Sequence, residues 1–209
     1  MTDPYALIDD LAHCAQPVSR LAPPMRRALG WIVAALVAGF AATRLMPVLV
    51  TDWRAPFAGM AMAAAMLSLL LGALLVAGAF TVSIAGRQFR LAVWLGPLLA
   101  AWVVLSGVYI LSSTTTIGKL GDGRYCFLFI VTAGLPMAGV MMLALRRSKS
   151  PWPARTGFLA GSGVAFLSLA LLGLCHASRL TMVDFVMHIA GTLVVVAFTT
   201  AFSRYWLKI

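Results

Sequence analysis

The uncharged run FAGMAMAAAMLSLLLGALLVAGAFTVSIA, residues 57 to 85, decides the fold class of this chain. A bilayer core of about 30 Å is crossed by about 20 apolar helical residues, and this run exceeds that length. A backbone inside lipid must satisfy its own hydrogen bonds, and a helix does so within one segment. The run therefore predicts a transmembrane helix.

Five further apolar runs satisfy the same rule. The six predicted spans are residues 28–50, 57–85, 91–111, 126–145, 157–177 and 183–203. The chain is 62% hydrophobic and 11% charged, whereas soluble domains are about 45–50% apolar. We therefore expect an all-α polytopic membrane protein: a bundle of six transmembrane helices at 28–203, a cytoplasmic tail at 1–27 and a short C-terminal tail at 204–209.

The net charge of +10 bears on orientation rather than on nucleic acid. The basic residues lie in short clusters between apolar runs, where they orient helices against the cytoplasmic leaflet. With the N-terminus inside, roughly eleven Lys and Arg fall on the inner side and roughly five on the outer side. Both termini are thus predicted to be cytoplasmic, in a bacterial inner membrane, with the lipid bilayer as a partner and no direct nucleic-acid binding.

The span interiors disfavour transport and catalysis. Ionisable side chains in mid-membrane usually mark ion or proton pathways, and the middles of these spans hold nothing more polar than Ser, Thr and Tyr. Metal-protease, phosphate-loop, redox-pair and nucleophile-elbow motifs are missing from the sequence. We expect no enzyme, no catalytic residue and no resident cofactor. A membrane redox enzyme or permease, and a structural subunit of a membrane complex, remain the alternatives.

Two cysteines share one side of the membrane in this topology. Cys126 opens the fourth span and Cys175 closes the fifth, and a helical hairpin returns the chain to the face that it left. Thiols outside the cytoplasm can form a disulfide. His176, Asp184 and His188 could add metal ligands. The alternative is structural: cysteine is a common small buried residue, and a histidine near a span end often bonds water or a carbonyl.

The tail carries a different kind of signal. Residues 5–14, YALIDDLAHC, predict a short amphipathic helix whose apolar stripe is Leu7, Ile8, Leu11 and Cys14. About ten residues are too few for a stable isolated helix, so the stripe needs a covering surface. Asp9 and Asp10 on the polar side disfavour anionic lipid. A protein partner is therefore favoured.

Three stretches carry a resemblance to a known family. They are LIDDLA with PVSRLAPPMRRALGW (residues 7–12 and 17–31), YCFLFIVTAGLPMAGVMMLALRR (125–147) and PARTGFLAGSGVAFLSLALLGLCH (153–176). Together with the six-helix layout, they resemble the NrsF-type membrane anti-sigma factors, the negative regulators of sigma F. The resemblance covers essentially the whole chain, and it consists of spaced Pro, Arg, Gly and Cys rather than a catalytic signature.

The resemblance implies a function and a set of site residues. In that family a cytoplasmic N-terminal segment holds an extracytoplasmic-function sigma factor, and two periplasmic cysteines are needed for release under oxidative or heavy-metal stress. The sensor thiols would be Cys126 and Cys175, with heavy metal bound only transiently. The matching sigma-binding residues would be Leu7, Ile8, Asp9, Asp10, Leu11, Pro17 and Arg20. One departure is the segment ASRLTMVDFVMH (177–188), which lacks the Trp and most of the acidic residues usual there.

Overall fold

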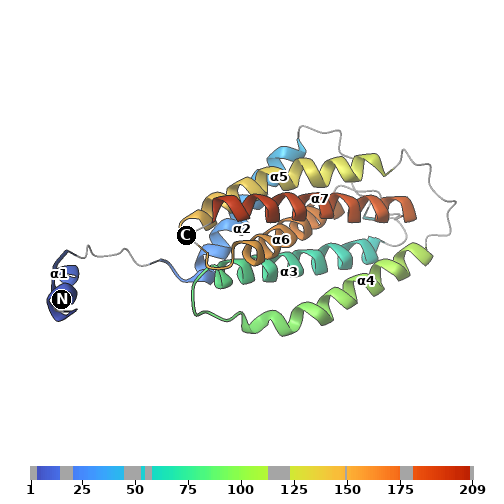
Figure 1. Cartoon of the computed structure of the whole chain (residues 1–209). Coiled ribbons are helices and arrows are strands. Elements are labelled where there is room, and N and C mark those ends of the chain that lie inside the picture. The colour runs from blue at the N-terminus through green and yellow to red at the C-terminus, as the bar shows by residue number, and fades with distance from the viewer. Residues whose placement is uncertain are drawn as a thin grey trace.

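The computed structural model of this chain describes residues 4–14, 21–44, 53–54, 58–112, 123–148, 150–174 and 181–207, and these contain helices but no strand (Figure 1). The elements are α1 (Pro4–Cys14), α2 (Pro24–Thr43), α3 (Ala58–Val82), the 3-10 helix η1 (Arg90–Trp94), α4 (Leu95–Ser112), α5 (Arg124–Arg146), α6 (Pro153–Gly173) and α7 (Met182–Trp206). Six segments, η1 being continuous with α4, are long and apolar enough to cross a membrane. The predicted fold class is confirmed.

The helix ends differ from the predicted ends by a few residues. Helix α2 begins at Pro24, inside the segment predicted as tail, and α7 continues to Trp206, past the predicted end at residue 203. Proline suits the first helical position because its missing N–H is not needed there. Arginine can lie in an apolar span because its long side chain reaches back to the headgroups. A helix can thus extend beyond the part of it that was predicted to cross the membrane.

Helix α6 forms the centre of the bundle and packs against α2, α3, α5 and α7. Its contact with α3 depends on two glycines that face each other. A Cβ on Gly163 would lie 3.0 Å from the backbone nitrogen of Val76, and one on Gly72 would lie 3.0 Å from the backbone oxygen of Gly163. Glycine thus lets two backbones approach closely enough for dispersion contacts, which drive helix association in lipid.

Gly157 and Gly161, spaced four residues apart on α6, lie at its interface with α7. A Cβ on Gly157 would overlap the side chain of Ser203, and one on Gly161 would lie 3.0 Å from the Cα of Val196. Helix α7 therefore packs along the opposite side of α6 from α3. These two glycines therefore let α6 and α7 pack closely.

Helix α4 packs on α3 at the edge of the bundle (Figure 1). Its main anchor is Trp102, which is 6% exposed. The Trp102 ring packs edge-on against Phe166 of α6 at 5.5 Å and stacks on Phe185 of α7 at 6.1 Å between centroids. Trp102 therefore connects α4 to α6 and α7 in addition to its neighbour α3.

Candidate functional site

The predicted thiol Cys126 and the predicted ligand Asp184 are in contact. Cys126 lies in the first turn of α5 and Asp184 in the first turn of α7, and they are 4% and 5% exposed. The Cys126 thiol donates to Oδ1 of Asp184 with an Sγ to Oδ1 distance of 3.7 Å. A long-range contact between two buried polar groups thus joins the starts of these helices.

Asp184 also caps its own helix. Its Oδ2 accepts from the backbone nitrogen of Thr181 at 3.1 Å and from the Thr181 hydroxyl at 2.8 Å. The Thr181 hydroxyl in turn accepts from the backbone nitrogen of Asp184 at 3.2 Å. This reciprocal arrangement is a capping box, and a carboxylate at a helix N-terminus is favoured by the helix dipole. One carboxylate therefore serves both the α7 cap and the α5 thiol.

A glycine brings the two helix starts together. A Cβ on Gly123, the residue before α5, would lie 2.7 Å from the Met187 side chain and 3.2 Å from the Val183 carbonyl oxygen. Even alanine at position 123 would require the Met187 side chain to move and the two backbones to separate by a few tenths of an ångström. Such a displacement would lengthen the contact between Cys126 and Asp184.

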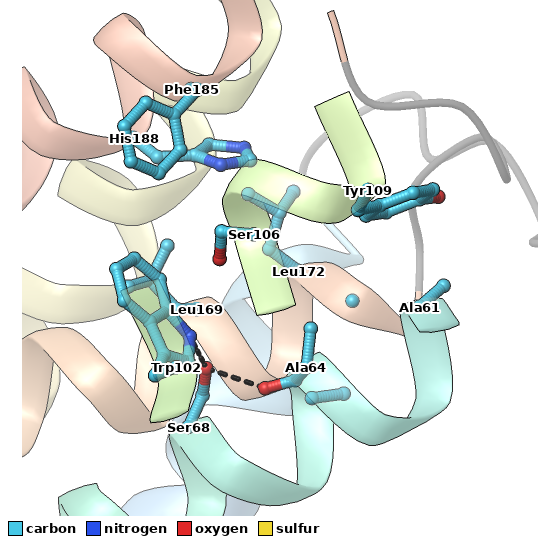
Figure 2. Close-up of a pocket in the computed structure, with 12 residues that line it drawn as sticks. Ala61, Ala64, Ser68, Trp102, Ser106, Tyr109, Leu169, Leu172, Phe185 and His188 are labelled. Carbon is cyan, nitrogen blue, oxygen red and sulfur yellow. Dashed lines mark hydrogen bonds between the residues drawn. The ribbon is translucent and has the colours of Figure 1, made fainter. Parts of the chain in front are cut away.

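His188 lies one turn beyond Asp184 and lines a cavity between α3, α4, α6 and α7 (Figure 2). The cavity holds about 70 Å³ and its polar walls are Ser68, Trp102, Ser106, Tyr109 and His188. The Trp102 indole donates to the Ser68 hydroxyl at 2.8 Å, and that hydroxyl donates to the Ala64 carbonyl at 2.8 Å. This volume suits a few waters, which need polar partners such as these.

Of the five residues predicted as possible metal ligands, the structure places two next to each other. Cys126 and Asp184 are adjacent, whereas His188 contributes to the cavity wall. Cys175 and His176 lie outside the described residues. Within the described ranges, no three His, Cys, Asp or Glu side chains gather to hold a metal ion. A complete site would therefore need a ligand from elsewhere in the chain or from water.

The tail segment forms the helix expected from its pattern. Asp9 and Asp10 are exposed, and Ile8 and Leu11 are 60% and 63% exposed, so these two residues of the apolar stripe lack a covering surface. Figure 1 shows α1 apart from the bundle. The side chain of Leu7 and the whole of Pro17 and Arg20 lie outside the described residues.

Sequence reasoning missed Thr181 and the polar cavity wall. The cap was visible as T-x-x-D at residues 181–184, since a Ser or Thr three residues before an acid is a capping signal. Trp102 and Ser68 gave no such signal, because nothing in hydropathy shows which helices are neighbours.

The chain was compared with family models, curated proteins and solved structures, and no match was found.

Proposed function

We propose that this protein is a membrane-embedded anti-sigma factor of the bacterial inner membrane. Both termini face the cytoplasm, α1 binds an extracytoplasmic-function sigma factor, and a redox or heavy-metal signal on the periplasmic side releases it. The proposal requires no enzymatic step and no resident cofactor. Heavy metal would be bound only while the signal lasts.

The observation that carries the proposal is the uncovered amphipathic helix α1. Ile8 and Leu11 leave an apolar stripe open, and Asp9 and Asp10 give the helix a negative side. A helix of this size needs a surface for its stripe. A groove on a protein with basic surroundings satisfies both features, and it is the usual way to bind an amphipathic helix.

The release step is assigned to the start of α5. Cys126 and Cys175 could give two electrons and two protons to an oxidant and form a disulfide, or could both bind a soft metal ion as thiolates. Either reaction consumes the thiol proton that Cys126 donates to Asp184. Because Asp184 caps α7, the reaction would alter the first turn of that helix.

The docking claim is tested by co-purification of the full-length protein with each extracytoplasmic-function sigma factor encoded in the source genome. The variant Ile8→Asp/Leu11→Asp places charge on the apolar stripe and should abolish capture of the cognate factor. Ala6→Asp is the matched control, because Ala6 is exposed on the same helix and lies away from the stripe. Capture that survives the double substitution, or that is lost equally in the control, refutes docking through the stripe.

The sensing claim is tested with a reporter of the sigma factor's promoter. Cys126→Ser and Cys175→Ser should each abolish induction by a thiol oxidant or a soft metal ion. Cys14→Ala is the control, since it removes the exposed thiol at the end of α1 and keeps an apolar side chain at that position of the stripe. Normal induction in either of the first two variants contradicts the assignment of these thiols.

A further inference from the structure

A groove of about 410 Å³ lies where the start of α2 meets the end of α5. Arg27, Trp31, Phe80, Val140, Leu143 and Arg147 are among its lining residues. The two arginines lie where the helices begin and end, and apolar side chains form the rest of the groove wall. Val140 and Leu143 are 36% and 57% exposed, so this wall is open on the outer surface of the bundle.

Arg27 is held in a fixed position. Its Nη2 donates to the carbonyl of Ala144 at 3.0 Å and to the hydroxyl of Ser148 at 3.3 Å. Its guanidinium lies over the Phe80 ring, 4.9 Å from the centroid. These contacts join α2, α3 and α5, and they place a cation against the negative end of the α5 dipole.

Two donors in the groove wall have no acceptor within the described ranges. They are Nη1 of Arg27 and the indole Nε1 of Trp31, a side chain that is only 4% exposed. Leaving a buried donor unpaired costs about 1–3 kcal/mol, and more when the donor is charged. Both atoms are enclosed by their neighbours, so a ligand oxygen would remove that cost once a side chain of the groove wall moves aside.

Within the described part of helices α2 to α7, no aspartate lies at this end of the bundle. The six acidic residues of the chain are Asp3, Asp9, Asp10, Asp52, Asp122 and Asp184. Asp184 caps α7 at the opposite end of the bundle, and Asp52 and Asp122 lie outside the described residues. Among the described aspartates, Asp9 and Asp10 of α1 are the ones on the same side of α2 along the chain as Arg27.

We propose that this groove binds an anionic phospholipid, with the phosphate against Arg27, Trp31 and Arg147 and an acyl chain along Val140 and Leu143. Arginine recognises phosphate through charge-assisted, often bidentate hydrogen bonds. Basic pockets between transmembrane helices bind anionic lipid headgroups. The apolar wall favours a lipid over free phosphate, which would leave that wall uncovered. The stripe of α1 could also cover it, but α1 lies apart from the bundle (Figure 1), so the tail is treated as an outcome of the test.

The test uses the full-length protein in neutral detergent, with lipid adducts counted by native mass spectrometry. Phosphatidylglycerol should bind in preference to phosphatidylcholine, and millimolar inorganic phosphate should not displace it. Arg147→Gln should weaken phosphatidylglycerol binding by about tenfold or more, and Trp31→Phe by about three- to tenfold, as expected for one hydrogen bond each. Arg147 is exposed, so its substitution leaves the packing intact.

Arg90→Gln is the matched control, since it removes the same charge from an exposed residue of η1 outside the groove. Equal binding of the two lipids, displacement by inorganic phosphate, unchanged affinity in Arg147→Gln or Trp31→Phe, or equal loss in Arg90→Gln each overturns the proposal. Asp9→Asn/Asp10→Asn should leave lipid affinity unchanged. A rise in affinity in that variant would identify the tail as the occupant and also overturn the proposal.

Discussion

Replacing Gly163 by alanine should destabilise the bundle although alanine is the better helix former. The new Cβ would lie 2.8 Å from Cγ2 of Val76, 3.0 Å from its backbone nitrogen and 3.1 Å from the carbonyl oxygen of Gly72. The Val76 side chain can rotate, but the two backbone atoms cannot move unless α3 separates from α6. Overpacking of this kind costs about 1–3 kcal/mol.

Gly107→Ala is the matched control, because Gly107 is also a glycine within a transmembrane helix and a Cβ there would meet nothing within 4 Å. Both substitutions gain the same helix propensity, about 1 kcal/mol in model peptides. That gain cancels in the comparison, so the difference between the variants reports the steric term alone. We expect Gly163→Ala to be less stable than Gly107→Ala by about 1–3 kcal/mol.

The measurement is equilibrium unfolding of the two variants in mixed micelles by titration with sodium dodecyl sulfate, followed by far-ultraviolet circular dichroism. Gly72→Ala should behave like Gly163→Ala, because its Cβ would lie 2.8 Å from Cγ of Leu167 and 3.0 Å from the Gly163 carbonyl oxygen. Equal stability of Gly163→Ala and Gly107→Ala would refute the close approach of α3 and α6 described above.

Three further substitutions test the polar contacts, with the same unfolding measurement. Trp102→Phe keeps an aromatic ring against Phe166 and Phe185 but removes the donor to Ser68. We expect the free energy of unfolding to fall by about 1 kcal/mol, and an unchanged value would contradict that hydrogen bond. Thr181→Val removes the α7 cap and should cost about 1 kcal/mol. Thr192→Val should instead be neutral or stabilise by about 1 kcal/mol, because that buried hydroxyl has no acceptor or donor among the described residues; destabilisation would show that the hydroxyl is satisfied.

Hydropathy predicted how many helices are long and apolar enough to cross a membrane, because an apolar run of sufficient length has few alternatives in lipid. It could not predict the neighbours of each helix. Gly72 and Gly163 are two of 18 glycines in the chain, and nothing in their local sequence shows that they face each other. The partners are selected by the fit of whole helix surfaces, which a single sequence does not display.

The candidate site divides in the same way. The alternation of spans predicted that Cys126, at the start of the fourth span, and Asp184, at the start of the sixth, share one side of the membrane. Their contact depends on the close approach of α5 and α7 at Gly123, which spacing along the chain does not reveal. The uncovered stripe of α1 was predictable, since its periodicity is local.

Helix α7 touches α5 at both of its ends. Near one end Asp184 accepts from Cys126, and at the other the Arg146 guanidinium lies 5.2 Å from the centroid of the Trp206 ring. Because a helix is stiff, a tilt of α7 at the contact with Cys126 would also change its contact with Arg146 at the other end. A reaction of the Cys126 sulfur would therefore alter the surroundings of Trp206 at the opposite end of the bundle.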